Sequence, residues 1–112
     1  MKIEDRQLND IIVLSVSGNI DALTSSTLTA HIKDHISKGN VKLIADLKSV
    51  DYTSSAGLRV LLGAVKETRA LNGDMRLANI QPNVQKVLAL SGFTNILKIY
   101  ADVDSAVNSF TQ

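Results

Sequence analysis

The sequence contains no cysteine and no tryptophan, and only 4% of its residues are aromatic. The lack of cysteine excludes a disulfide framework, a thiol nucleophile and a cysteine-based zinc site, and it fits a cytoplasmic protein. No stacking surface for bases or sugars is evident, because aromatic residues are so few. Twelve Lys and Arg against eleven Asp and Glu leave a net charge of +1, so we expect no nucleic-acid partner.

Long apolar runs and phosphate-binding glycine motifs are also missing. No segment approaches the roughly 20 residues of a membrane-spanning helix, and Met1–Arg6 carries charges where a signal peptide needs an apolar stretch. Neither the dinucleotide-binding fingerprint nor the P-loop pattern occurs. We therefore expect a cytoplasmic protein without membrane insertion and without a cofactor.

What the 112 residues do contain is an alternation of strand and helix patterns, with 45% hydrophobic residues to form one core. We expect a single domain over residues 1–112. The predicted strands are Lys2–Gln7, Ile11–Ser17, Val41–Leu47, Met75–Ala78 and a last one near Lys98–Ala101. The predicted helices are Thr24–Lys38, Ser55–Leu71, one from Pro82 to the C-cap Gly92, and one that follows the N-cap Asp102.

This alternation predicts an α/β fold whose mixed, mostly parallel sheet is flanked by about four helices. The carboxyl ends of parallel strands share one edge of the sheet, where ligand sites of α/β proteins form. We therefore expect Asp21 and Asp46 to lie on the same edge as Ser54 and Ser55. Each aspartate also fits a structural role, Asp21 in tying down its loop and Asp46 in bonding to nearby backbone.

The run Asp51–Leu58 places two serines where a loop becomes a helix, and we call Asp51–Ser55 the serine loop. The first turn of a helix has unpaired N–H groups and the positive end of the helix dipole, so it favours an anionic group such as a phosphoserine. Serine is equally common as a simple N-cap. The loop alone does not separate these two roles.

The sequence gives little support for a catalytic site. A serine nucleophile needs a base, and the two histidines, His31 and His35, lie on the first predicted helix, remote from the serine loop. Their i, i+4 spacing suits a metal, but no third ligand is suggested, so we expect no metal site and interpret them as surface or boundary residues.

The helix after the serine loop carries a second candidate feature. Its stripe of Leu58, Leu61, Leu62 and Val65 predicts the face that packs on the sheet. Ala56, Val60 and Gly63 should then project to the opposite side as a low apolar strip, on which a partner helix can pack. Isolated small apolar residues are also ordinary on protein surfaces.

Four segments in this order resemble the STAS domain of bacterial anti-sigma factor antagonists, and together they span nearly the whole chain. They are Gly18–Asp21, Ala45–Leu47, Asp51–Leu58 and Leu90–Phe93. In that family a partner kinase phosphorylates the serine two residues before the glycine of the loop, which corresponds here to Ser55, before Gly57. Ser54 stands where several members carry Asp, and it is the second choice for the phosphosite. Ala56 replaces what is often a Ser or Thr.

The resemblance implies a regulatory protein rather than an enzyme. Such a protein captures a serine kinase that is also an anti-sigma factor, is released when Ser55 is phosphorylated, and is reset by a metal-dependent serine phosphatase. Asp21, Asp46 and Gly57 would surround the phosphosite, and Ala56, Val60 and Gly63 would contact the kinase. Two alternatives remain: a STAS scaffold or transporter-accessory subunit in which Ser55 only caps its helix, and a small phosphoryl-transfer enzyme that uses Asp46 and Ser55.

Overall fold

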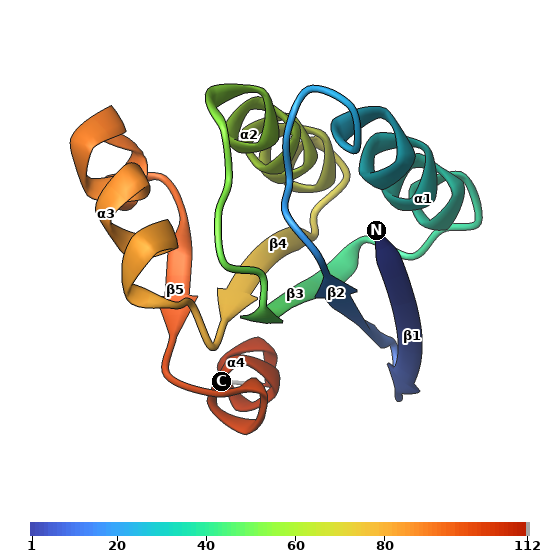
Figure 1. The fold of residues 1–112 in the computed structure, drawn as a ribbon. Coiled ribbons are helices and arrows are strands. Elements are labelled where there is room, and N and C mark those ends of the chain that lie inside the picture. Colours follow the sequence, from blue (N-terminus) through green and yellow to red (C-terminus); the bar gives the residue numbers. More distant parts are fainter. Residues whose placement is uncertain (112) are drawn as a thin grey trace.

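A five-stranded sheet runs through the middle of the molecule, as a computed structural model shows for residues 1–111, apart from the Thr94 side chain (Figure 1). The strands lie side by side in chain order, β1 antiparallel to β2 and all other neighbours parallel. Their bounds are β1 Lys2–Leu8, β2 Ile11–Ser17, β3 Lys42–Ser49, β4 Asp74–Ala78 and β5 Lys98–Tyr100. The predicted mixed, mostly parallel sheet is confirmed.

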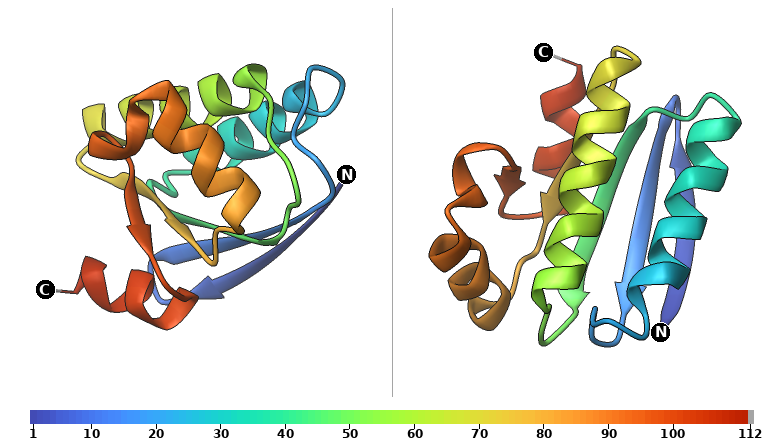
Figure 2. Two further views of the ribbon diagram at one scale, coloured as in Figure 1. Left: turned by 60° about the vertical axis from the view of Figure 1, so that its left-hand side comes forward. Right: turned by 90° about the horizontal axis from the view of Figure 1, so that it is seen from above.

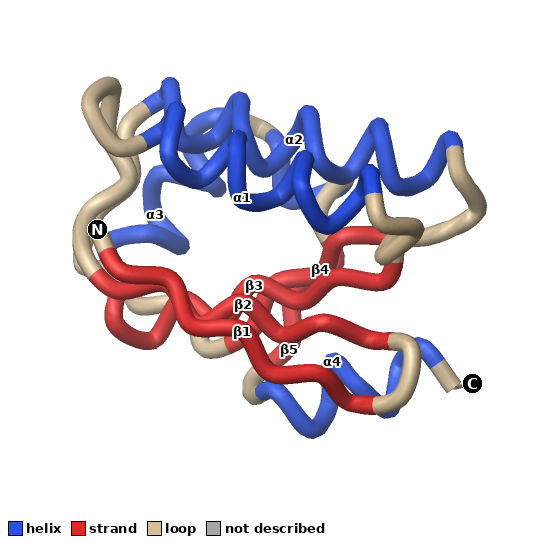
Figure 3. Tube along the Cα trace, turned by 90° about the vertical axis from the view of Figure 1, so that its right-hand side faces the viewer, coloured by secondary structure: helices blue, strands red, loops and turns tan. Residues whose placement is uncertain are grey.

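Helices cover both faces of this sheet. Three of them, α1, α2 and α3, lie on one face, and α4 lies on the other (Figure 3). Their bounds are α1 Ser25–Ser37, α2 Ser55–Ala70, α3 Pro82–Ser91 and α4 Val103–Phe110, with a short 3-10 helix at Phe93–Asn95. Helices α1 and α2 lie next to each other along the strands (Figure 2).

Coverage of both faces explains why β2 begins with an uninterrupted apolar run. Side chains alternate along a strand, so Ile12 and Leu14 enter the larger core beneath α1, α2 and α3. Ile11 and Val13 enter the smaller core beneath α4. A strand that is buried on both faces has no polar side to display.

The predicted elements agree with the structure to within a few residues, with one difference that matters for the site. The sequence pattern ended the third strand at Leu47, but β3 continues to Ser49. Asp46 therefore lies inside the strand rather than at its carboxyl end. The apolar pattern ended early because Lys48 and Ser49 are exposed, although their backbone still belongs to the strand.

Candidate functional site

The serine loop is fixed against the loop that follows β2. The Ile20 N–H donates to the Tyr52 carbonyl at 3.0 Å, and the Ser54 N–H donates to the Ile20 carbonyl at 2.8 Å. Ile20 and Thr53 thereby form an isolated parallel bridge, and both are buried. Backbone bonds thus hold the serine loop in place before helix α2 begins.

The two serines have different positions at the start of α2. Ser54 is the N-cap: its backbone is extended, with φ −86° and ψ 175°, and its hydroxyl accepts a hydrogen bond from the Gly57 N–H at 3.4 Å. Ser55 is the first helical residue, and its side chain is exposed. Within residues 1–111 the Ser55 hydroxyl makes no hydrogen bond, so it is accessible from solvent.

Gly57 is required by packing rather than by an unusual backbone angle. The residue is buried in the first turn of α2, and a Cβ placed on it would collide with the Thr53 hydroxyl and the Ile20 side chain. The glycine therefore lets the helix approach the bridge between the two loops. Sequence reasoning used Gly57 to locate the serine and placed it beside the phosphosite, but it missed Ile20 and Thr53, which pack against this glycine.

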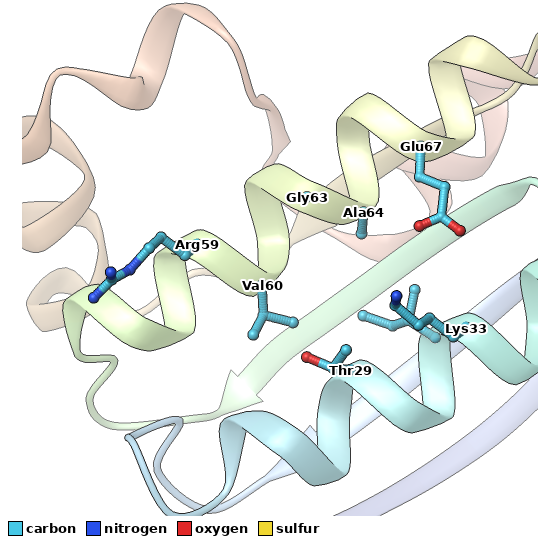
Figure 4. Close-up of a pocket in the computed structure, with 8 residues that line it drawn as sticks. Thr29, Lys33, Arg59, Val60, Gly63, Ala64 and Glu67 are labelled. Atoms are coloured by element: carbon cyan, nitrogen blue, oxygen red, sulfur yellow. The ribbon is translucent and has the colours of Figure 1, made fainter.

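The start of α2 offers a favourable environment for an anion. Its first turn contains no acidic residue, and the N–H groups of Ser55 and Ala56 have no acceptor inside the helix. Arg59 lies one turn after Ser55 and is exposed, with its side chain extended toward the beginning of the helix (Figure 4). Residues at i and i+4 of a helix are neighbours, so a negative group on Ser55 can pair with this guanidinium.

Asp21 directly follows Ile20 and so lies next to the serine loop. Its carboxylate, however, makes its hydrogen bonds within the loop that precedes α1. Oδ1 accepts hydrogen bonds from the Thr24 N–H at 3.0 Å, the Thr24 hydroxyl at 3.1 Å and the Leu23 N–H at 2.9 Å. The Thr24 N–H above all, helped by the other two donors, holds the pKa of Asp21 below its ordinary value. Asp21 therefore stays charged and fixes the turn before α1, which is the structural role considered for it.

Asp46 lies near the carboxyl ends of the strands, opposite Ser15 and Ala78, but on the other face of the sheet from Ser55, so the expectation that it surrounds Ser55 is wrong. It shares the α4 face of β3 with Ile44, whereas α2 covers the opposite face. Its carboxylate is buried and accepts from the Lys48 N–H at 3.2 Å and the Asn79 side-chain amide at 3.1 Å. The difference arises because β3 continues past Asp46, and the strand's alternation then decides the face.

The strip expected on the free side of α2 is only partly exposed. Gly63 is exposed, with open space where a Cβ would lie, but Ala56 and Val60 are half-buried, and Val60 packs against the core. The prediction that all three residues face away from the sheet is therefore wrong for Val60. The reason is α1, which lies beside α2 and covers part of that side.

Between the two helices lies a groove of about 310 Å³ (Figure 4). Val60 and Thr29 point toward each other across it, and Gly63 leaves it open on the α2 side. Charged side chains of both signs line its rim, namely Lys33, Arg59 and Glu67. On α2 the groove begins at Arg59, one turn after Ser55.

The structure also brings the two histidines of α1 to a carboxylate that sequence reasoning missed. Asp5 of β1 lies within hydrogen-bond distance of both His31 and His35. Asp5 lies on strand β1, which ends at Leu8, whereas helix α1 begins at Ser25, and a contact between such distant segments leaves no local signal in the sequence.

Comparisons with known proteins agree with this architecture. The family model described as the STAS domain matches residues 2–106. The anti-sigma F factor antagonist of Paenibacillus polymyxa is 27% identical over 100% of this chain and 94% of its own. The crystal structure of an anti-sigma factor antagonist from Mycobacterium paratuberculosis has a TM-score of 0.86 at 23% identity, covering 99% of this chain and 94% of that one.

A further solved relative is the Bacillus cell fate determinant SpoIIAA in its phosphorylated form. It superposes with a TM-score of 0.73 at 21% identity over 97% of this chain and 99% of SpoIIAA. Likeness at this level of identity establishes a common fold. Within residues 1–111, no helix has the length and apolar character needed to cross a membrane.

Proposed function

The chain belongs to the STAS domain family, and on that premise we propose that it is an anti-sigma factor antagonist controlled by phosphorylation of Ser55. In the unmodified state it captures an anti-sigma factor that is also a serine kinase. Phosphorylation releases the kinase, and a serine phosphatase restores the capturing form. Both exchanges take place in the cytoplasm, where the kinase finds ATP.

The observation that carries this proposal is the division of roles between the two serines. Ser54 already caps α2, because its hydroxyl accepts from the Gly57 N–H. Ser55 is therefore not needed as a cap, and its exposed hydroxyl is available to a kinase. This favours a phosphosite over the scaffold alternative, in which Ser55 would serve as the cap.

The site can accept a phosphate without loss of the fold. A phosphate adds about −1.5 to −2 charges at neutral pH, and at a helix N-terminus each exposed charge is favourable by roughly 0.3–1 kcal/mol. Arg59 supplies a cation one turn away. The backbone bridge between Ile20 and Thr53 does not involve the Ser55 side chain, so the loop keeps its conformation.

At an interface the same phosphate is strongly unfavourable. A like charge about 4 Å away costs roughly 4 kcal/mol at an effective dielectric constant near 20, which corresponds to nearly a thousandfold in affinity. The phosphate can thus prevent binding without remodelling the domain. The kinase would contact the surface beside Ser55, which includes Ala56 in the first turn of α2 and, further along the helix, Val60 and Gly63 on the α2 side of the groove.

The enzymatic alternative required Asp46 and Ser55 to act together. Asp46 points to the α4 face and is hydrogen-bonded there to Asn79, while Ser55 begins a helix on the other face. The pair therefore does not form a site. This arrangement supports a binding protein over a phosphoryl-transfer enzyme.

Peptide mapping by mass spectrometry, on protein isolated from its own cells and on protein treated with its kinase and ATP, tests the proposal. We expect a single phosphate on Ser55, which Ser55→Ala abolishes. Ser54→Ala is the matched control: it loses the cap and about 1 kcal/mol of stability, yet Ser55 is still phosphorylated. Phosphate on Ser54 or Thr53 would refute the residue assignment, and no phosphate in either sample would refute the switch.

A further inference from the structure

Asp5, His31 and His35 form a compact group of three metal-ligand side chains on the α1 side of the molecule. His31 Nε2 lies 2.7 Å from Asp5 Oδ1, and His35 Nε2 lies 2.8 Å from Asp5 Oδ2. One ligand atom from each residue can be chosen so that all three lie within 4.8 Å of one another. Both imidazoles thus direct the same nitrogen at one carboxylate.

The fold, rather than side-chain flexibility, produces this convergence. The histidines are one turn apart on α1, so both project from the same side of the helix. Asp5 lies on β1 two residues after Ile3, which packs against the core beneath α1 and α2, and alternate residues of a strand share a face. The carboxylate is therefore presented to α1 by the backbone of β1.

We propose that Asp5, His31 and His35 bind one divalent transition-metal ion of the zinc class. Imidazole nitrogen and carboxylate oxygen are ligands that Zn²⁺ accepts in tetrahedral sites, and three protein ligands leave the fourth position for water. Magnesium prefers an all-oxygen octahedral shell, so it is disfavoured by the two imidazoles.

The distances suit a site that tightens around an ion. Bond lengths of about 2.0–2.2 Å to zinc place tetrahedral ligands roughly 3.4 Å apart, so the carboxylate and the rings must separate by about half an ångström. The side chains of Asp5 and His31 are 35% and 30% exposed, which leaves them room to move and gives an ion access. His35 is held more firmly, at 11% exposure.

Asn40 supplies the outer hydrogen bond that metal-bound histidines usually make. Its side-chain amide lies 3.2 Å from His35 Nδ1. When Nε2 binds a metal, Nδ1 carries the proton and needs an acceptor, which the amide oxygen of Asn40 provides after rotation of the amide group. The ion would then tie the edge strand β1 to α1 independently of the state of Ser55.

Metal titration of the full, tag-free 112-residue chain tests this site. We expect Zn²⁺ to bind one to one by calorimetry and to raise the Tm by at least about 5 °C when in large excess over its Kd. Co²⁺ should give the intense visible absorption of a four-coordinate ion. Millimolar Mg²⁺ should leave the Tm unchanged.

Variants identify the ligands. His31→Gln and Asp5→Asn should each weaken Zn²⁺ binding at least tenfold and abolish the Tm increase. Asp34→Asn removes a negative charge from the same helix while sparing all three ligands, and it should bind zinc within about twofold of the wild type. Circular dichroism shows whether each variant is folded. If His31→Gln unfolds, zinc binding by Asp5→Asn, which changes a residue of β1 instead of α1, still tests the ligand assignment.

Three results would overturn the proposal: no saturable binding by the wild type, unchanged binding in a folded ligand variant, or equal losses in Asp34→Asn and His31→Gln. The last would mean that zinc is attracted by charge alone. None of these measurements depends on the kinase or on Ser55, so failure of the metal site and failure of the proposed switch are distinguishable.

Discussion

Ile20 and Thr53 form a parallel bridge between the loops that leave β2 and β3, and the bridge lies directly beneath Gly57. It joins two crossover connections that are more than 30 residues apart in the chain. Because Ser55 begins α2 two residues after Thr53, the bridge fixes where the exposed hydroxyl is presented. The position of the candidate phosphosite thus depends on two buried neighbours.

The first prediction tests this packing. Gly57→Ala should lower the free energy of unfolding by about 1–3 kcal/mol, because the new methyl group overpacks the space beside Thr53 and Ile20. Gly63→Ala on the same helix has open space around it and should be neutral or stabilising by up to about 1 kcal/mol. Urea denaturation measures both. Equal stabilities of the two variants would show that the bridge tolerates a side chain.

A second prediction separates binding from folding. Ser55→Asp should keep a Tm close to that of the wild type, because a helix N-terminus accepts a negative charge. Its affinity for the kinase should fall at least tenfold, or about 1.4 kcal/mol, as measured by calorimetry. The asparagine side chain of Ser55→Asn has nearly the same shape as aspartate but no charge. Ser55→Asn should therefore bind the kinase much more tightly than Ser55→Asp. Equal binding by the two would contradict the electrostatic mechanism.

The third prediction concerns the groove between α1 and α2. Gly63→Glu should fold normally, because Gly63 is exposed and a Cβ there meets no neighbouring atom within 4 Å. The new side chain should obstruct a partner in the groove, and both kinase capture and Ser55 phosphorylation should be lost. Ala70→Glu adds the same charge to the last turn of α2 and should leave both intact. Pull-down assays measure kinase capture, and phosphorylation assays measure modification of Ser55. Normal capture of the kinase by Gly63→Glu would place the interface elsewhere.

The fourth prediction is a pH dependence that arises from Asp21. Its pKa is held below the ordinary 3.8 in the folded protein, chiefly by the Thr24 N–H, so the unfolded chain binds this proton more readily. The resulting stability is fully present above about pH 5 and is lost as the pH falls through the lower folded value. Asp21→Ala should therefore have a smaller free energy of unfolding than the wild type at pH 7. This difference in stability should shrink as the pH is lowered.

Urea denaturation between pH 7 and pH 2 measures this gap. Asp21→Asn serves as the control, because an amide oxygen still accepts from Thr24 and Leu23 but does not titrate. The gap between Asp21→Asn and Asp21→Ala should not vary with pH. A wild-type advantage over Asp21→Ala that persists unchanged at pH 2 would contradict the role assigned to the carboxylate.

Most of the secondary structure was predictable because its signals are local. The apolar stripe of Leu58, Leu61 and Leu62 identifies α2, and the uninterrupted run Ile11–Leu14 identifies a strand buried on both faces. The helix that begins at the serine loop followed from the same patterns. Strand ends were less certain: exposed Lys48 and Ser49 interrupt the apolar signal while their backbone stays in β3.

The sequence by itself determined that the chain forms one α/β domain of the STAS type, with two adjacent serines at the start of a helix. Only the tertiary structure decided that Ser54 caps the helix and Ser55 is free, that Asp46 faces α4, and that Asp5 meets His31 and His35. The physical reason is the range of the interactions. Periodicity and helix signals are encoded within a few neighbouring residues, whereas these contacts depend on strand register and helix packing between distant segments.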